Sequence, residues 1–542
     1  MKLIAQSENI ENIVDKESIY VDKTEYIYNL TKTFERVFFS RPRRFGKSLT
    51  LNTIRTLFEK GVDPYFKGTW IYDKWDQDKY PVLQLNFLKY RTTSLEEFKE
   101  IFSSKISEFA DSLKLTKRIK SKDPDLAISE LFTALDEKRI VILIDEYDCQ
   151  LTANINNPEL YEKFRICIRE FYAALKGAKQ IKFLAVTGVT RLKDVSIFSV
   201  GSDIMDLSYE NDYSSMIGFT RDEIKKFYDD YLKLGISIEK DKSADSVTNE
   251  EIDEFVDRIA DNYDGFSFDE FHKNKVFSTF SVNGFLQSIY RKKCVEFGDY
   301  WYDVGGLPSI LINYMESHNL DIEKLLTSEI AVPYDDFKNP TSLIDINENV
   351  LMCQAGYLTL KSELDPVDDV ILGTANQEVK SALFRLLSLK VYKRNVSPYG
   401  AGGSGKKNVL EHGTAEEIIS LFNEVLAALS YDKYPVKDES VLRALLQVYL
   451  IGKNHDVRIE QHNSKGRSDI IVNFPKRRVV LELKYTTEDN EEASKLDEAE
   501  KQIIDKCYGL ENLGDRELLQ IACVFNGAKD KRQIILYKTV GQ

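Results

Sequence analysis

With 542 residues, the chain is too long for a single hydrophobic core, and ordinary domain sizes predict about three or four units. Its composition, 43% hydrophobic and 30% charged, excludes a disordered or fibrous protein, and a formal net charge of -14 argues against nucleic-acid binding through overall charge. Six cysteines without a CxxC pair, a polar N-terminal segment and no apolar run of about 20 residues predict a cytoplasmic protein without signal peptide or membrane partner.

Residues 1–215 alternate short apolar runs, such as RVFFS, RIVILIDE and IKFLAVTG, with longer amphipathic runs. Strands that are apolar on both faces and separated by helical segments predict an α/β domain, with a parallel sheet and helices on both faces. Residues 216–395 suggest a helical or α+β middle region, either a lid or a winged-helix-like unit. A Gly/Ser-rich linker is predicted at 396–413, followed by a second α/β domain at 414–542.

Two stretches are candidates for a phosphate-binding loop of the pattern GxxxxGK[ST]. GAGGSGKK, residues 400–407, has both glycines and the lysine, but a second lysine replaces the hydroxyl residue. Its next helix signal is a capping box at Thr414 and Glu417, so we interpret this stretch as a flexible linker. RPRRFGKS, residues 41–48, has Arg41 at the first glycine position but lies between a strand and a helix, as a phosphate loop requires.

The second half of RPRRFGKS is complete. Lys47 can reach the β and γ phosphates of ATP, Ser48 can hold Mg²⁺, and the N–H groups around Gly46 can surround the phosphate oxygens. Because Arg41 precedes a proline, we expect an extended and stiffer entrance to the loop. For the two following arginines, added charge on the phosphates and a solvated basic turn both stay open. The predicted nucleotide contacts are Arg43, Arg44, Phe45, Gly46, Lys47 and Ser48.

Two later strand ends complete the predicted ATP site. RIVILIDEYD places Asp145 at the end of a buried strand, where it can hold Mg²⁺ through water, and Glu146 can orient or deprotonate the attacking water. An ordinary exposed loop is the alternative, but the complete lysine-serine loop upstream favours the catalytic interpretation. FLAVTGVTR ends in Thr187, Thr190 and Arg191, which could sense the γ phosphate, although a capped strand end has the same pattern.

A second group of candidate residues lies in GRSDIIVNFPKRRVVLELKY, residues 466–485. Side-chain alternation puts Glu482 and Lys484 on one face, and pairing about the turn places Asp469 directly opposite Glu482. Two such carboxylates repel unless a cation bridges them, which predicts Mg²⁺ or Mn²⁺, with Glu439 as a further carboxylate. Lys484 could then stabilise charge growing on a phosphate. The alternative is a solvated salt bridge, since ExK occurs in many amphipathic strands.

These residues follow the plan of the PD-(D/E)XK nucleases, with Ser468 in place of the proline. Overall the sequence resembles bacterial and archaeal AAA-ATPase-like proteins fused to a C-terminal PD-(D/E)XK nuclease domain. The resemblance rests on YVDKTEYI at 20–27, RPRRFGKS at 41–48, YPVLQLNF at 80–87, LIDEYD at 143–148, TGVTRLKDVSIFS at 187–199, and further on IGFTRDEI, YWYDVGGLPSIL, CQAGYLTL, GRSDIIV and LELKY.

The resemblance implies a P-loop ATPase fold for the first domain and a restriction-endonuclease-like fold for the last, with ATP controlling a metal-dependent nuclease. It implies that Arg41 is characteristic of the family and that Gln502 and Tyr508 are nuclease-motif positions, with Gln502 the catalytic contact. Ser202 and Asp203 depart from it, because the family usually has two asparagines there. The family is often associated with mobile elements or defence.

The expected partner is nucleic acid, with DNA favoured over RNA, while self-association into a homo-oligomer stays open. A basic run near the nuclease motif fits contact with a phosphate backbone, although a solvated charged face has the same composition. This run comprises Lys465, Arg467, Lys476, Arg477, Arg478, Lys501 and Lys506. The leading hypothesis is an ATP-regulated, Mg²⁺-dependent DNA nuclease. The alternative is a nucleotide-switched module that binds nucleic acid or protein without cutting.

Overall fold

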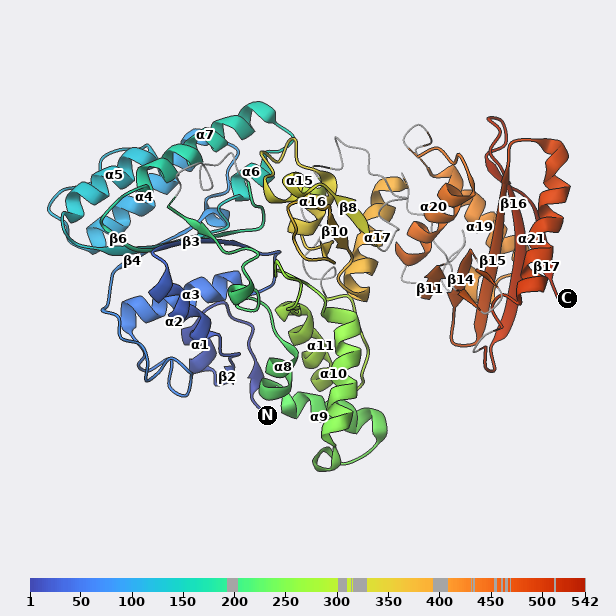
Figure 1. Ribbon diagram of the computed structural model, residues 1–542, viewed down its shortest axis with the longest axis horizontal. Helices are drawn as coiled ribbons and strands as arrows, with labels where there is room; N and C mark the ends of the chain where they lie inside the picture. Colours follow the sequence, from blue (N-terminus) through green and yellow to red (C-terminus); the bar gives the residue numbers. More distant parts are fainter. Residues whose placement is uncertain are drawn as a thin grey trace. The chain divides into compact units, whose positions relative to one another are not determined.

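In the computed structural model, the described residues form two compact units, the first ending at Val379 and the second beginning at Lys380 (Figure 1). The structure describes residues 1–192, 203–300, 310–312, 314, 329–392, 408–429, 431, 434–452, 456–459, 462–463, 466–467, 469–510 and 513–541. Ser202, Lys465, Ser468 and the glycine-rich stretch 400–407 lie outside these residues. The predicted domain boundaries near residues 215 and 395 stay predictions.

The first unit is built on a five-stranded parallel sheet with the order β4-β5-β6-β3-β7. Its strands are β3 (Arg36–Ser40), β4 (Val82–Asn86), β5 (Ile140–Asp145), β6 (Ile181–Gly188) and β7 (Met205–Asp206). Every residue of β3 and β5 is buried, because helices cover the sheet on both sides. A buried parallel sheet brings the carboxyl ends of β3, β4, β5 and β6 to one edge, which is where such folds bind ligands.

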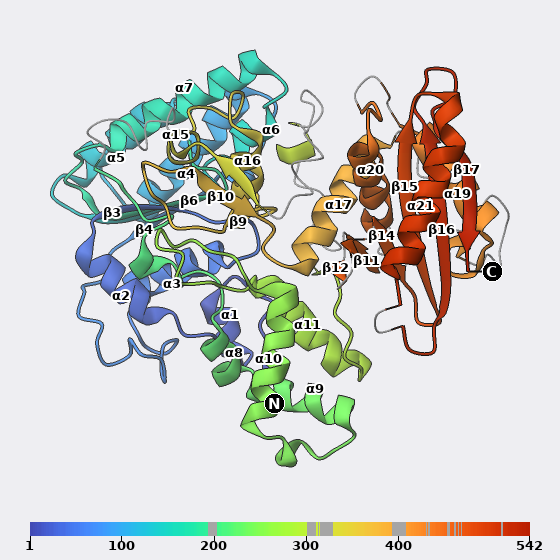
Figure 2. The same ribbon diagram turned by 45° about the vertical axis from the view of Figure 1, so that its right-hand side comes forward.

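Helices cover both faces of this sheet, as Figures 1 and 2 show. One face carries α1 (Ile10–Asp15), α2 (Thr24–Thr33) and α3 (Lys47–Lys60), and the other carries α4 (Leu95–Ser112), α5 (Pro124–Leu135) and α7 (Pro158–Leu175). The short helix α6 (Cys149–Ala153) follows β5. The α/β fold predicted for this part of the chain, a parallel sheet between two helical layers, is confirmed.

The middle part of the first unit is a helical cluster followed by a small sheet. The helices are α8 (Arg221–Phe227), α9 (Asp229–Lys240), α10 (Asn249–Tyr263) and α11 (Thr279–Lys292), and they share a core that includes Leu232, Ile259 and Phe285. Capping boxes start α8 at Thr220 and α10 at Thr248. The antiparallel sheet orders β8 (Ile330–Val332), β10 (Val370–Gly373) and β9 (Thr359–Leu360), beside α15 (Tyr334–Lys338) and α16 (Glu348–Gln354).

The second unit contains a mixed sheet with the order β11-β14-β15-β16-β17. Its strands are β11 (Asp456–Ile459), β14 (Ile470–Asn473), β15 (Arg477–Thr486), β16 (Glu517–Asn526) and β17 (Gln533–Val540), and only β15 and β16 run parallel. α21 (Glu492–Lys506) covers one face, while α19 (Ala415–Ala427) and α20 (Glu439–Gly452) lie on the other (Figure 2). Ala499 and Ile503 of α21 pack against Val480 of β15.

Two further helices precede α19 in the chain. α17 (Gln377–Val391) contains the boundary between the units, and α18 (Val409–His412) is a single helical turn before α19. The capping box predicted at Thr414 and Glu417 is confirmed at the start of α19, but α18 begins earlier than the helix signal in the sequence indicated. A four-residue turn is too short to produce a hydrophobic period, so the sequence pattern cannot reveal it.

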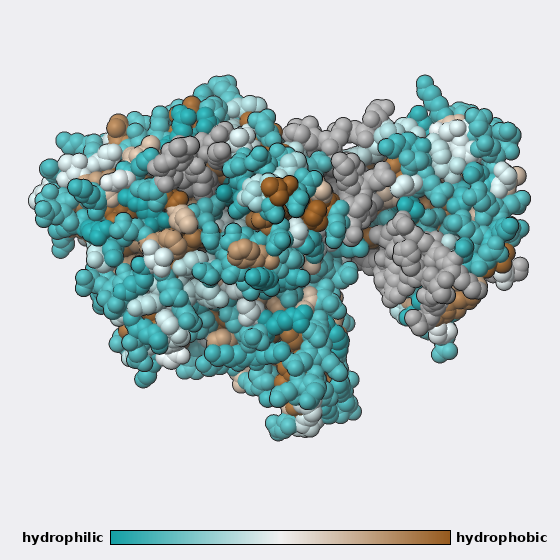
Figure 3. Space-filling view, viewed as in Figure 1, coloured by the Kyte–Doolittle hydropathy of each residue, from teal (hydrophilic) through white to brown (hydrophobic). Residues whose placement is uncertain are grey.

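The visible surface of the molecule is mostly hydrophilic, with small, scattered apolar areas (Figure 3). Among the described residues, none of the helices combines the length and the apolar character needed to cross a membrane.

Candidate functional site

The phosphate loop, residues 41–48, connects the end of β3 to the start of α3. Gly46 has φ +107°, a conformation that favours glycine, and a Cβ added there would meet no atom within 4 Å. The loop therefore has open space where α3 begins, and the free N–H groups of a helix N-terminus favour an anion at such a place. These features fit a bound phosphate group.

Three of the predicted residues meet at the carboxyl edge of the sheet. The buried carboxylate of Asp145 accepts hydrogen bonds from Ser48 Oγ, at 2.7 Å to Oδ2, and from Thr187 Oγ1, at 2.7 Å to Oδ1. These residues come from α3, β5 and β6, whose ends converge because the strands are parallel. A serine hydroxyl beside an aspartate is the oxygen-ligand chemistry that Mg²⁺ prefers with ATP.

Lys47 lies within the phosphate loop and beside Glu146. Its Nζ donates to the carbonyl oxygens of Arg41 and Pro42, at 2.9 and 3.1 Å, and lies 3.8 Å from Glu146 Oε1. Burial raises the pKa of Glu146, and the charge of Lys47 opposes that shift. The ammonium group can exchange its carbonyl partners for phosphate oxygens, and Glu146 has a raised proton affinity suited to a base.

The remaining predicted nucleotide contacts differ in their exposure and in their neighbours. Arg43 is exposed, whereas Phe45 is buried and Arg44 lies with its guanidinium over the ring of Phe280. The guanidinium of Arg191 contacts Asp206 of β7 and the carbonyl of Lys338. These two contacts lie outside the phosphate loop, and a role for Arg191 as a γ-phosphate sensor stays a prediction.

Two polar residues of the first unit, the half-buried Asn86 and the buried Asp148, escaped the sequence interpretation. Asn86, at the end of β4, pairs with Asp145 across the sheet and donates from Nδ2 to Asp145 Oδ2 at 3.4 Å. Asp148 accepts hydrogen bonds from the backbone and the hydroxyl of Thr190, both at 2.6 Å. Asn86 could have been found from the polar end of YPVLQLNF, but the partner of Thr190 depends on the folded loop.

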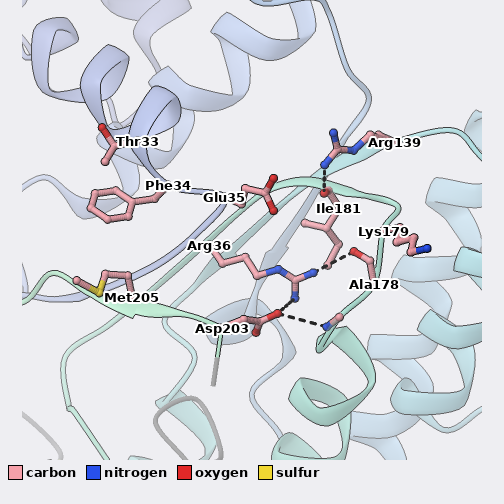
Figure 4. Close-up of a pocket in the computed structure, with 11 residues that line it drawn as sticks. Thr33, Phe34, Glu35, Arg36, Arg139, Ala178, Lys179, Ile181, Asp203 and Met205 are labelled. Atoms are coloured by element: carbon pink, nitrogen blue, oxygen red, sulfur yellow. Dashed lines mark hydrogen bonds and ion pairs between the residues drawn. The ribbon is translucent and has the colours of Figure 1, made fainter. Parts of the chain in front are cut away.

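An open recess of about 630 Å³ lies at the opposite end of the same strands (Figure 4). It includes Arg36, at the start of β3, which ion-pairs with Asp203 at 2.9 Å and donates to the carbonyls of Leu175 and Ala178. None of the predicted nucleotide contacts lines it. Asp203, one of the two departures from the family pattern, thus has a partner within the fold.

In the second unit, the hairpin of β14 and β15 has the predicted register. Ile470 pairs with Leu481, which places Asp469 opposite Glu482 just beyond the end of β14. Asp469 is buried and accepts a hydrogen bond from the backbone N–H of Leu483 at 2.9 Å. Its Oδ1 is 3.0 Å from Nη1 of Arg443, a residue of α20 that the sequence interpretation missed. The carboxylate therefore already has a counter-charge.

Glu482 and Lys484 lie on the same face of β15 and are both buried. Lys484 Nζ is 3.4 Å from Glu482 Oε1 and 3.4 Å from Glu439 Oε1 on α20, so the lysine links two predicted carboxylates. Burial and then Asp469 raise the pKa of Glu482 to about 8. Burial lowers the pKa of Lys484, but the charges of Glu482 and Glu439 outweigh it and raise the pKa above its ordinary value.

The second unit also contains an unpaired acceptor that suits a cation. Glu482 Oε2 is buried and has no hydrogen-bond partner, which is costly for a carboxylate oxygen. Within the described residues, no group of three or more His, Cys, Asp or Glu side chains is arranged to hold a metal ion. The described part of the site offers two carboxylates, Asp469 and Glu482, so a divalent cation bound there would complete its shell with water or substrate oxygens.

The two predicted nuclease-motif positions differ in their surroundings: Gln502 lies in α21, and Tyr508 lies in the turn after that helix ends. Gln502 Oε1 is buried without a partner, whereas Tyr508 packs into the core that α21 forms with the sheet.

Two arginines of the basic run bind backbone carbonyls within the fold. Arg477 donates to the carbonyl of Gly413 at 2.7 Å, and Arg478 donates to that of Gly509 at 2.8 Å. Both arginines are buried, so neither belongs to a solvated charged face, and contact of the basic run with a phosphate backbone stays a prediction.

Comparison with known proteins assigns both parts of the chain. Residues 6–198 match the family model described as predicted AAA-ATPase, and residues 437–534 match the model described as PD-(D/E)XK nuclease superfamily. The chain joins an AAA-ATPase-like domain to a PD-(D/E)XK superfamily domain. The phosphate loop lies in the first match, and Glu439, Asp469, Glu482 and Lys484 lie in the second.

Individual relatives are distant from this chain. An uncharacterized protein in the vnfD 5′ region of Azotobacter chroococcum mcd 1 is 27% identical over 501 residues, which are 90% of this chain and 89% of that protein. A Walker-type ATPase of Pyrococcus abyssi shares 12% identity, with a TM-score of 0.36 over 67% of this chain and 94% of that one. Cdc6p of Pyrobaculum aerophilum shares 12% identity, with a TM-score of 0.21 over 64% and 84% of the two chains.

The raised pKa of Glu482 predicts a pH-dependent stability of the nuclease-superfamily domain. Because the pKa rises from an ordinary 4.5 to about 8, the folded domain binds more protons than the unfolded chain between these values. The contribution to stability is complete below about pH 4.5 and is lost as pH rises through about 8. Glu482→Gln removes this loss, so in EDTA its melting temperature should exceed that of the parent by several degrees at pH 9 and by less at pH 5.

Melting curves of parent and Glu482→Gln in EDTA across this pH range measure the difference directly. A bound divalent cation competes with the proton on Glu482, so Mg²⁺ should flatten the pH dependence of the parent and leave that of the variant unchanged. Parallel curves for the two proteins in EDTA would contradict the prediction.

Proposed function

We propose that the AAA-ATPase-like domain binds and hydrolyses ATP with Mg²⁺. Two contacts support this proposal. Lys47 Nζ lies inside the phosphate loop, and Ser48 Oγ donates a hydrogen bond to Asp145. Lys47 would bind the phosphates, Ser48 and Asp145 would hold the cation, and Glu146 would take a proton from the attacking water. When bound, Mg²⁺ neutralises charge on the phosphate oxygens.

For the C-terminal domain we propose cleavage of DNA phosphodiester bonds with Mg²⁺ or Mn²⁺. The observation that carries this proposal is the unpaired Oε2 of the buried Glu482, which lies beside Lys484 and opposite Asp469. Asp469 and Glu482 would hold the cation, which polarises a phosphoryl oxygen when bound. Lys484 would donate to the phosphate as its charge grows, and Gln502 would contact the substrate or water.

The ATPase would regulate or drive the nuclease, in a pathway of defence or of mobile elements. The test incubates the purified full chain with single- and double-stranded DNA and RNA, with Mg²⁺, Mn²⁺ or EDTA, and with or without ATP. We expect cleavage of DNA that requires a divalent cation and changes in rate with ATP. Absence of cleavage from every combination would overturn the nuclease proposal, and a rate independent of ATP would overturn regulation.

A second candidate function is a nucleotide-switched module that binds nucleic acid or protein without cutting. The 3.0 Å ion pair between Arg443 and Asp469 favours it, since this carboxylate is neutralised without a metal. This reading predicts ATP-dependent binding of labelled DNA, measured by fluorescence anisotropy, with no products on a gel in either cation. Cleavage that is lost in Lys484→Ala would exclude it.

A further inference from the structure

The phosphate loop packs on one side against the chain segment that leads into α11. The ring of Phe45 packs at near right angles against Phe266 and Phe268, with ring centroids 4.8 and 5.4 Å away. All three rings are buried. Edge-to-face aromatic contacts add to the energy of burial and fix relative orientation. A loop residue predicted to contact the nucleotide is therefore part of a core shared with residues more than 200 positions later in the chain.

Arg41 joins the same aromatic group. Its side chain is 1% exposed, and its guanidinium carbon lies 4.2 Å from the ring centroid of Phe268. Nη1 donates to the carbonyls of Ser40 and Ser208, at 2.8 and 2.6 Å. A desolvated cation over an aromatic face is among the stronger contacts of this kind. Arg41, the residue at the first glycine position, thus connects the phosphate loop to Ser208 and Phe268 through a buried side chain.

The backbone and the side chain of Arg41 serve different neighbours. Its carbonyl oxygen accepts a hydrogen bond from Nζ of Lys47, while its guanidinium binds the segment after β7 and the ring of Phe268. When Lys47 turns to a phosphate, the carbonyls of Arg41 and Pro42 lose this donor. The guanidinium contacts need no such change, so they can hold the loop in place in both states.

The backbone of Arg44 connects the loop to α11. Arg44 has φ +73°, an uncommon conformation for a residue with a side chain, and its carbonyl accepts from Thr279 Oγ1 at 2.9 Å and from the N–H of Phe280 at 3.4 Å. These are the first two residues of α11. The phosphate loop therefore supplies an acceptor to the N-terminus of the helix that is central to the middle cluster.

We propose that Arg41 and Phe268 are positioning residues for the nucleotide, and that α11 responds to nucleotide binding through its contact with Arg44. The inference rests on the proposed ATP binding. It adds which residues position the phosphate loop and which helix responds when the nucleotide binds. The clamp, comprising Arg41, Phe45, Phe266 and Phe268, keeps the loop in the conformation that accepts phosphate. If a variant lowers the population of that conformation, the apparent affinity for ATP falls by the same factor.

The test compares Phe268→Leu with Phe268→Tyr and with Phe271→Leu. Leucine keeps an apolar side chain but removes the aromatic face, tyrosine keeps the face, and Phe271 is an exposed residue of the same segment. We expect ATP affinity, measured by calorimetry on the full chain, to fall about tenfold in Phe268→Leu and to match the parent in the other two. A melting temperature within a few degrees of the parent separates positioning from loss of fold.

Two further measurements make the outcome specific. Hydrogen exchange at the first turns of α11 should slow when ATP binds the parent and change less in Phe268→Leu. Arg41→Gly, which restores the usual glycine, should weaken ATP binding as well, whereas a loop that merely tolerates arginine would bind as tightly or more tightly.

The possible outcomes can be distinguished from one another. No ATP binding by the parent would overturn the proposed ATPase and this inference with it. Binding by the parent at equal affinity in Phe268→Leu and Arg41→Gly would overturn the positioning role alone, and unchanged exchange in α11 would overturn the response of that helix.

Discussion

Replacing Lys484 with alanine should reduce DNA cleavage by about 100- to 1000-fold, the usual effect of removing one donor to developing charge. Lys484 Nζ is buried between Glu482 and Glu439, at 3.4 Å from each, so the substitution removes the positive charge next to the proposed cation ligands. The variant also removes the cation that lowers the pKa of Glu482, which should weaken binding of Mg²⁺ at neutral pH. Single-turnover cleavage of labelled DNA measures the first effect, and calorimetric titration with Mg²⁺ measures the second.

Lys538→Ala is the matched control for this prediction. Lys538 lies on β17 of the same sheet and pairs with Glu500 at the surface, at 2.7 Å, so its loss removes the same charge without touching the buried carboxylates. We expect cleavage and Mg²⁺ binding within about twofold of the parent, because surface ion pairs contribute little. Undiminished cleavage by Lys484→Ala would show that the domain cuts elsewhere or that a contaminant cuts.

In both candidate sites, the contacts that could be predicted from the sequence join residues of one hairpin or residues at the ends of parallel strands. The opposition of Asp469 and Glu482 follows from one short hairpin and the two-residue period of strands, and the register agrees. The meeting of Ser48, Asp145 and Thr187 follows from the rule that parallel strands end at one edge. Strand periodicity was enough in the first case, and periodicity together with this rule of sheet topology was enough in the second.

Contacts that depend on the orientation of a helix or on the packing of a loop could not be predicted in this way. Arg443 reaches Asp469 from a helix whose orientation depends on the whole domain, and Phe268 reaches Arg41 across a chain separation that no periodic pattern covers. A single residue carries no signal of its partner, because many arginines and phenylalanines fit the same local pattern. The same limit applies to Arg477 and Arg478, since charge alone does not reveal the backbone carbonyls that they bind.

Replacing Lys47 with alanine should weaken ATP binding by about 100-fold, because a buried charged donor to phosphate is lost. Lys47 is 4% exposed and held at the loop by two carbonyls, so it is placed to bind without a large rearrangement. Lys60→Ala is the control, since Lys60 ends the same helix and pairs only with Glu11 among the ion pairs that the described residues form. Binding of a fluorescent ATP analogue measures both variants, and equal affinity for Lys47→Ala and the parent would show that the nucleotide binds elsewhere.

Glu146→Gln distinguishes hydrolysis from binding alone. Burial gives Glu146 a raised pKa, and the amide keeps its size while removing its ability to take a proton. We expect ATP affinity near that of the parent and phosphate release reduced by about 100- to 10,000-fold. A parent that binds ATP through Lys47 but releases no phosphate would instead mean that the nucleotide is a structural ligand. In that case ATP could license the nuclease by occupying the phosphate loop, but its hydrolysis could not drive it.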